Sequence, residues 1–245
     1  MKNHYLNPTN PFRVVFYIGI CCLFSACSID TSNFTFDETE MNGVKAVQQY
    51  LPGVALSIKK GVSVKTGSGK VKTYILSVSY TDNPSQIETL EQSSALAWVI
   101  YEQLNDSLRQ KYDAIETKVS GANLSYKQTY SMETLAKVQK CMGNAKLFTQ
   151  GFIDANSQLI EQSFGGNEDK IREIAYELTK GDMWAGLKAD WGEVDRQKLA
   201  SFSTPNDSSL VISFRLHWNK EPFDTYHRVD LTHDTESGKI TNIDL

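Results

Sequence analysis

Residues 95–101, with the sequence ALAWVIY, are apolar without interruption and lie inside a longer stretch of helical periodicity. Spacings of three and four predict a helix over about residues 85–119, with Gly121 as its stop. Leu96 and Val99 fall on the side opposite the main apolar stripe. A helix that is apolar on two sides must be covered on both. We therefore expect it in the middle of the fold, between a preceding hairpin and later helices.

The segments before this helix predict a short helix over residues 41–51 and then a β-hairpin. Residues 54–64 are rich in β-branched and small side chains, residues 66–69 are typical of a turn, and residues 71–80 alternate apolar and polar positions. The sequence of residues 85–88 matches a capping box, which favours a helix start there.

The segments after the helix predict a strand over residues 124–130 and further helices over residues 132–191. We expect a break near Gly143 or Gly151 and a helix cap at Asn167. The last 37 residues alternate over three short runs separated by turns, which predicts a three-stranded antiparallel meander. The expected fold class is α+β: an N-terminal hairpin packed on a long helix, middle helices and a C-terminal meander.

The first 27 residues have the pattern of an export signal. Lys2 and Arg13 are positive, no acidic residue precedes Asp30, and residues 14–26 form a run of 13 uncharged residues. A membrane-spanning helix needs about 20 apolar residues, so this run is too short to span. Its length is typical of the apolar region of a secretory signal peptide. Small residues, Ser25 and Ala26, then precede Cys27.

Residues 23–27, LFSAC, resemble the lipobox of bacterial lipoproteins, although Phe24 stands where an aliphatic residue is usual. The resemblance implies that the Cys27 thiol receives a diacylglyceryl group, that cleavage precedes Cys27, and that the new N-terminus is acylated with a fatty acid such as palmitate. Ser28 after the cysteine favours the outer membrane over the inner. The alternatives are an ordinary cleaved signal with an incidental cysteine and an uncleaved anchor.

The expected organisation has four parts: a signal peptide over 1–26, a polar lipidated tether over 27–40, and α+β domains over 41–143 and 144–245, which could pack as one unit. Helices followed by a meander ending in GKITNIDL loosely resemble the cone-shaped NTF2-like fold over residues 145–245. That fold hosts ligand pockets, isomerases and bare scaffolds, so the resemblance implies no single function.

Charge and cysteine content exclude some classes of function. The formal net charge is −4, whereas nucleic-acid-binding domains are usually basic, so we expect no nucleic-acid partner. Residues 67–70, GSGK, end like a phosphate-binding loop but lack its first glycine and its following hydroxyl residue. Cys141 has no CxxC partner, and we expect a buried structural thiol.

No set of residues forms a coherent catalytic or metal-binding motif. His227 and His233 share strand parity but lie six residues apart, about 20 Å along a strand, which is too far for one metal ion. His217 stands on another strand, and cross-strand pairing could bring it near one of them. We therefore expect no metal, no cofactor and no catalytic residues.

The sequence predicts a bacterial cell-envelope lipoprotein that faces the periplasm and acts as a non-enzymatic binding or interaction module. Its partners would be the membrane, through the lipid, and an envelope protein or a small apolar ligand. Candidate pocket residues are Trp184, Trp191, His217 and His227. The alternative is a lipid-anchored enzyme with an acid–base site in a C-terminal NTF2-like pocket.

Overall fold

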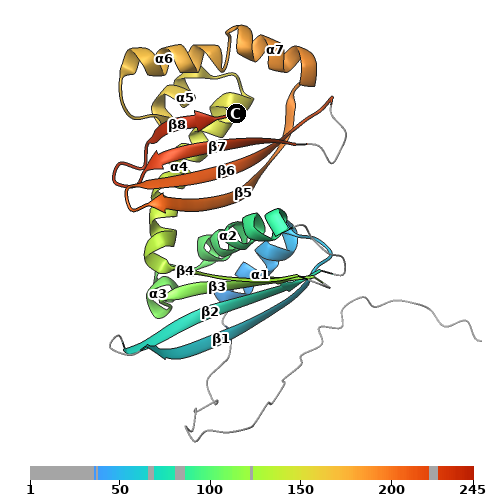
Figure 1. Ribbon diagram of the computed structural model, residues 1–245, viewed down its shortest axis with the longest axis vertical. Coiled ribbons are helices and arrows are strands. Elements are labelled where there is room, and N and C mark those ends of the chain that lie inside the picture. Colours follow the sequence, from blue (N-terminus) through green and yellow to red (C-terminus); the bar gives the residue numbers. More distant parts are fainter. Residues whose placement is uncertain (1–35, 37, 66–68, 81–85, 122–123, 221–225) are drawn as a thin grey trace, which may run out of the picture. The chain divides into compact units, whose positions relative to one another are not determined.

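The computed structural model describes residues 36, 38–65, 69–80, 86–121, 124–220 and 226–245. Residues 35–245 form one compact α+β unit with two four-stranded sheets (Figure 1). The fold class is thus confirmed. The expected boundary between residues 143 and 144 falls inside a helix, α4 (Met132–Ile153).

The first sheet has the strand order β1-β2-β3-β4. The predicted hairpin is confirmed: β1 (Ala55–Lys65) and β2 (Gly69–Ser79) pair antiparallel from Ala55↔Ser79 to Lys65↔Gly69. β3 (Ala114–Ser120) runs parallel to β2, and β4 (Ser125–Ser131) runs antiparallel to β3. One face of this sheet carries the apolar side chains and is covered by helices α1 and α2.

Helix α1 (Glu38–Tyr50) begins three residues earlier than expected and includes Glu40, which is fully buried. The capping box expected at residues 85–88 lies outside the described side chains. Helix α2 (Gln86–Gln103) is covered on two sides, as its apolar composition predicts. Ser93 Oγ lies 2.6 Å from Thr117 Oγ1 of the first sheet, while the neighbouring Ser94 Oγ accepts from the Phe202 amide of the second sheet at 3.0 Å.

The element that packs against the second side of α2 differs from the expectation. It is the edge strand β5 (Val194–Asn206) rather than later helices. The long helix over 85–119 is also wrong. It ends at Gln103, a short helix α3 (Asp106–Lys111) follows behind the Asn105 cap, and residues 114–120 form strand β3. Leu96 is fully buried, whereas Val99 is only half-buried.

The second half begins with α4 (Met132–Ile153), and the chain breaks after Gly151, as predicted for one of the two glycines. Three shorter helices follow: α5 (Ser157–Ser163), α6 (Glu168–Glu177) and α7 (Asp182–Trp191). Asn167 caps α6 as expected, because its side-chain oxygen accepts from the Lys170 amide at 3.1 Å.

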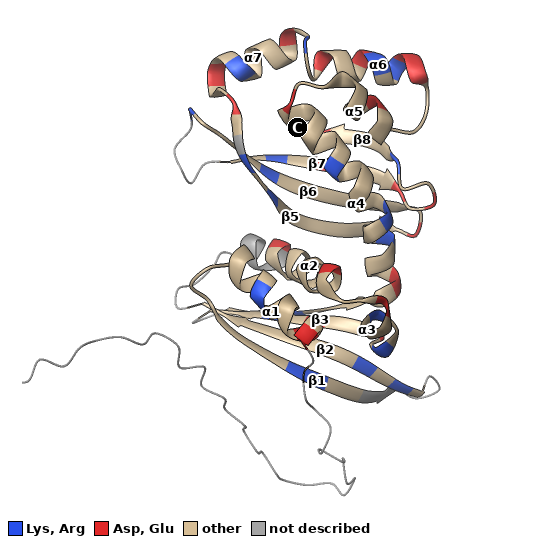
Figure 2. Ribbon diagram, turned by 180° about the vertical axis from the view of Figure 1, so that it is seen from behind, with Lys and Arg blue, Asp and Glu red and all other residues tan. Residues whose placement is uncertain are grey.

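The second sheet is an antiparallel meander of four strands, not three, in the order β5-β6-β7-β8. Its strands are β5 (Val194–Asn206), β6 (Ser209–Trp218), β7 (His227–Asp234) and β8 (Ile240–Asp244). Helix α4 crosses one face of the sheet and contacts β6, β7 and β8 (Figures 1 and 2). We call this the helical face of the second sheet and the other its open face.

Candidate functional site

A groove with an apolar lining lies between helix α6 and the edge strand β8. α6 is amphipathic, with Ile171, Ile174 and Leu178 on one side and acidic residues in its first turn. It packs mainly against α5, and its apolar residues form one wall of the groove, with β8 as the other wall. Ile171 and Ile174 are left half-buried.

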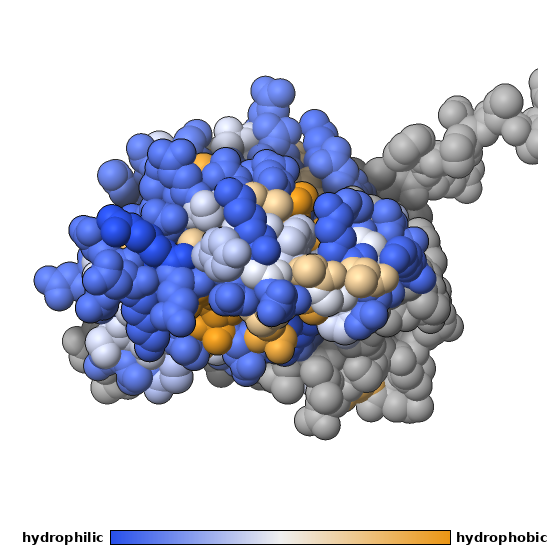
Figure 3. All heavy atoms as spheres, turned by 90° about the horizontal axis from the view of Figure 1, so that it is seen from above, coloured by the Kyte–Doolittle hydropathy of each residue, from blue (hydrophilic) through white to orange (hydrophobic). Residues whose placement is uncertain are grey.

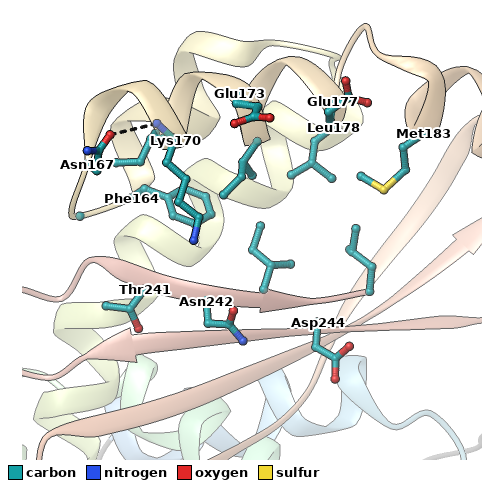
Figure 4. A pocket seen from close by; sticks show the side chains of 15 residues that line it. Phe164, Asn167, Lys170, Glu173, Glu177, Leu178, Met183, Thr241, Asn242 and Asp244 are labelled. Atoms are coloured by element: carbon teal, nitrogen blue, oxygen red, sulfur yellow. Dashed lines mark hydrogen bonds between the residues drawn. The ribbon is translucent and has the colours of Figure 1, made fainter.

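The register of β8 decides which of its side chains enter the groove. Ile243 pairs with the buried Leu231, which places Ile243 on the helical face. Asn242 and Asp244, one residue to either side, therefore point to the open face. Figure 4 shows both side chains directed away from α6.

The groove has a volume of about 570 Å³, within the range of ligand-binding pockets. Its apolar lining includes Ile171, Ile174, Leu178, Met183, Ile243 and Leu245. Met183 is 41% exposed and Leu245 is 51% exposed, so the apolar lining reaches the surface. Figure 3, a view onto the side of α6 and α7, shows apolar patches among the hydrophilic side chains.

The charged residues around the groove are mostly acidic: Glu173 and Glu177 lie on α6 with Lys170, and Asp244 borders the groove from β8 while its carboxylate points to the open face. Figure 4 shows the two glutamates along α6 and the Lys170 side chain reaching toward the strands. The lining thus combines an apolar interior with a net negative border.

At one end of the groove the chain itself borders β8. Phe164 and Ile240 form an isolated parallel bridge, and the Gly165 amide donates to the Ile240 carbonyl at 3.0 Å. Gly166 then adopts φ +120°, a conformation that favours glycine, and directs the chain into α6. Beyond Ile240, the outer edge of β8 faces the groove.

Three of the four residues expected in a pocket lie together on the helical face. Trp184 and Trp191 both contact Trp218, with ring centroids 6.1 and 5.7 Å away, and Trp191 stacks on His227 at 3.7 Å. Trp184 is buried, so this cluster contributes to the core. His217 follows Leu216, the cross-strand partner of His227, and therefore lies on the open face. The structure does not bring His217 and His227 together, and ligand binding by the four stays a prediction.

The open face of the second sheet carries a row of basic residues. Lys198, Arg215 and Arg228 are direct cross-strand neighbours on β5, β6 and β7 (Figure 2). Glu91 of α2 joins two of them, since its carboxylate oxygens bind Arg215 at 2.5 Å and Arg228. Lys198 donates to the Tyr50 carbonyl at 2.8 Å, and burial followed by the charge of Arg215 lowers its pKa. This network ties α2 to the sheet.

Two further candidate residues, Cys141 and His233, are buried in the fold. Cys141 is fully buried on α4, as expected, and burial raises the pKa of its thiol to about 11. His233 is fully buried, and its Nδ1 donates to the Gly238 carbonyl at 3.1 Å. Within the described ranges, no group of three or more His, Cys, Asp and Glu side chains is placed to hold a metal ion.

Cys27 and the expected tether up to residue 35 lie outside the described residues. Among the helices that are described, none has the length and apolar content needed to cross a membrane. No protein-family model matches the chain, and no curated protein matches it at a significant level.

The sequence indicated α6 correctly but not the groove. The apolar residues of α6 and those of β8 are more than 60 positions apart, and only the strand order brings them together. The sequence signals that could have indicated the groove are the apolar Met183 beside Asp182 and the apolar Leu245 beside Asp244.

Proposed function

We propose that this protein is a lipid-anchored bacterial envelope lipoprotein whose folded unit is a non-enzymatic binding module, and that the groove between α6 and β8 is its binding site. The observation that carries this proposal is the groove itself. It offers about 570 Å³ of space between apolar side chains of a helix and those of a sheet edge. Burial of such surface by a ligand is favourable by about 25 cal/mol per Å².

The anchor is supported by the residues that resemble a lipobox, with Cys27 as the lipidated position. One acyl chain holds a protein weakly, whereas two or three hold it stably at a membrane surface. An acylated Cys27 would place the folded unit beside the periplasmic side of a membrane, and Ser28 favours the outer one. The binding partner would be an apolar ligand or an apolar segment of another envelope protein.

The alternative, an acid–base enzyme, has weaker support in the described residues. His217 and His227 lie on opposite faces of the second sheet, so the strands do not bring them together as an acid–base pair. The carboxylate of Glu91, which lines a second hollow of about 400 Å³ between α2, β4 and β5, is engaged by two guanidinium groups. The apolar groove, by contrast, already has the lining of a binding site.

The groove can be tested with a neutral apolar dye, N-phenyl-1-naphthylamine, because its border repels anionic dyes. Residues 28–245 contain the whole compact unit and are the protein to titrate. We expect saturable fluorescence enhancement with one site per chain. Met183→Asn should weaken dye binding at least about fivefold, since it places an amide at an apolar surface.

Tyr176→Asn is the matched control, since Tyr176 is an exposed residue of α6 that does not line the groove. Its dye affinity should equal that of the unsubstituted chain. Both substitutions replace exposed side chains, so the melting temperatures of the two variants should stay close to that of the unsubstituted chain. Dye binding that is absent, or that Met183→Asn and Tyr176→Asn reduce equally, would contradict the proposed site.

A further inference from the structure

We propose that the occupant of the groove is an extended peptide that adds to β8 as a fifth strand of the second sheet. This inference rests on the proposed function and narrows it to one kind of partner. Strand addition supplies affinity through main-chain hydrogen bonds and specificity through alternate side chains.

The first support is that β8 ends the sheet. Among the described residues, the order β5-β6-β7-β8 leaves the outer edge of β8 without a strand beside it, apart from the single bridge of Ile240 to Phe164. Exposed edges with unpaired amide and carbonyl groups are templates for further pairing.

The second support is that the chain already pairs there. The Gly165 amide donates to the Ile240 carbonyl at 3.0 Å, which is a strand contact on the outer edge of β8. Gly166 then turns away to the Asn167 cap, so this pairing stops after one bridge. The outer edge of β8 therefore already pairs with another segment at its first residue, Ile240. The groove continues along the following residues of β8 to Leu245.

The third support is that the two faces of an added strand would meet different surfaces. Side chains on the helical face would enter the groove, among Ile174, Met183 and Ile243. Side chains on the open face would lie beside Asp244, whereas its cross-strand neighbour Asp230 already pairs with Arg228 at 2.7 Å. Because successive side chains of a strand alternate, the peptide that fits has apolar residues alternating with basic ones.

The probe for this test is an eight-residue peptide, blocked at both ends, in which valine alternates with lysine. A peptide of the same composition with four valines followed by four lysines is its control, since it cannot present one apolar face. We expect residues 28–245 to bind the alternating peptide, and the block peptide at least about tenfold more weakly.

Backbone methylation separates strand addition from simple apolar contact. A strand directs the amides of alternate residues to the same edge. Two versions of the peptide carry N-methyl groups at its odd or at its even positions. We expect one version to lose at least about tenfold in affinity through lost ladder hydrogen bonds. The other methylated version should keep most of the affinity of the unmethylated peptide.

Asp244→Asn tests the contact on the open face, and Asp207→Asn, an exposed acid in the turn after β5, is its control. The first should weaken binding of the alternating peptide several-fold and reduce its salt dependence, and the second should not.

Equal affinity of the two methylated peptides would overturn strand addition while leaving the apolar groove in place. Failure of the alternating peptide to bind, with dye binding intact, would also overturn it without affecting the proposed function. Loss of dye binding together with peptide binding would overturn both.

Discussion

Glu40 and Lys60 form an ion pair withdrawn from water, with Glu40 Oε2 2.9 Å from Lys60 Nζ and side-chain exposures of 0% and 8%. Lys111 Nζ lies 3.8 Å from the other carboxylate oxygen, and the Tyr112 hydroxyl donates to it. Glu40 is in the first turn of α1 and is the last residue of the expected tether, so the folded unit begins within that segment. The pair therefore fastens the start of the folded unit to β1 and to the end of α3.

We predict that Glu40→Gln destabilises the folded unit by about 3–5 kcal/mol. The substitution keeps the shape of the side chain but removes the carboxylate that lies 2.9 Å from the buried ammonium group of Lys60. Urea denaturation of residues 28–245 measures the change. Glu133→Gln is the control, because Glu133 pairs with Lys137 at the surface and should contribute about 0.5 kcal/mol or less. Equal effects of the two substitutions would disprove a buried role for Glu40.

A second prediction concerns the two covers of α2. Leu96→Ala should cost about 2–5 kcal/mol, since Leu96 is fully enclosed and its truncation leaves a cavity. Val99→Ala should cost about 1 kcal/mol or less, because Val99 is half-buried. Thermal and urea unfolding give both values. Similar losses at the two positions would show that the helix is not enclosed as described.

The sequence predicted the enclosure of α2 but not its end, for a physical reason. Leu104, Leu108 and Tyr112 continue the spacing of the helix although Asn105 interrupts it with a new cap. Ile115 and Val119 are four apart, which fits a helix, yet they are also the core positions of a strand together with Thr117. Strand β5 was missed because three register shifts interrupt its alternation.

A third prediction is a loss of stability in mild acid caused by His233. Burial lowers the pKa of its imidazole, and the hydrogen bond to the Gly238 carbonyl opposes this only in part. Below the ordinary pKa of about 6.5, an unfolded chain binds a proton at this residue before the folded chain does. The contribution of neutral His233 to the stability of the fold is therefore complete above about pH 6.5. It falls as the pH drops toward the lower pKa that His233 has in the folded chain.

The measurement is the urea midpoint at several pH values between 7.5 and 5. We expect His233→Gln to have a smaller decrease in stability over this range than the unsubstituted chain, whatever its absolute stability. The same slope for both chains would mean that another group causes the acid sensitivity.

A fourth prediction concerns the proposed anchor. In a bacterium that expresses the full chain, Cys27→Ser should remain an unprocessed precursor and should not incorporate labelled palmitate. Cys22→Ser is the matched control, because it removes a thiol five residues earlier in the same segment. It should be labelled and processed normally. Labelling of Cys27→Ser at the normal level would contradict lipidation at this position.

The proposed site shows where sequence reasoning reached its limit. The cap at Asn167 and the apolar side of α6 follow from local spacing alone. The presence of Ile243 and Ile174 in one groove depends on the pairing of β7 with β8 and on the bridge of Ile240 to Phe164 just before α6, which connect distant residues. Trp184 was assigned to a pocket by residue type, yet its contacts with Phe152 and Trp218 make it part of the core.

The account depends most on the groove between α6 and β8 being a binding site, and amide NMR of residues 28–245 tests this directly. On addition of the alternating valine–lysine peptide, we predict that chemical-shift changes concentrate in α6, α7 and β8. Those amides of residues 241–244 that point to the outer edge of β8 should also exchange more slowly with solvent, because they become part of a ladder. Shift changes confined to other parts of the fold, with unchanged exchange in β8, would contradict the account.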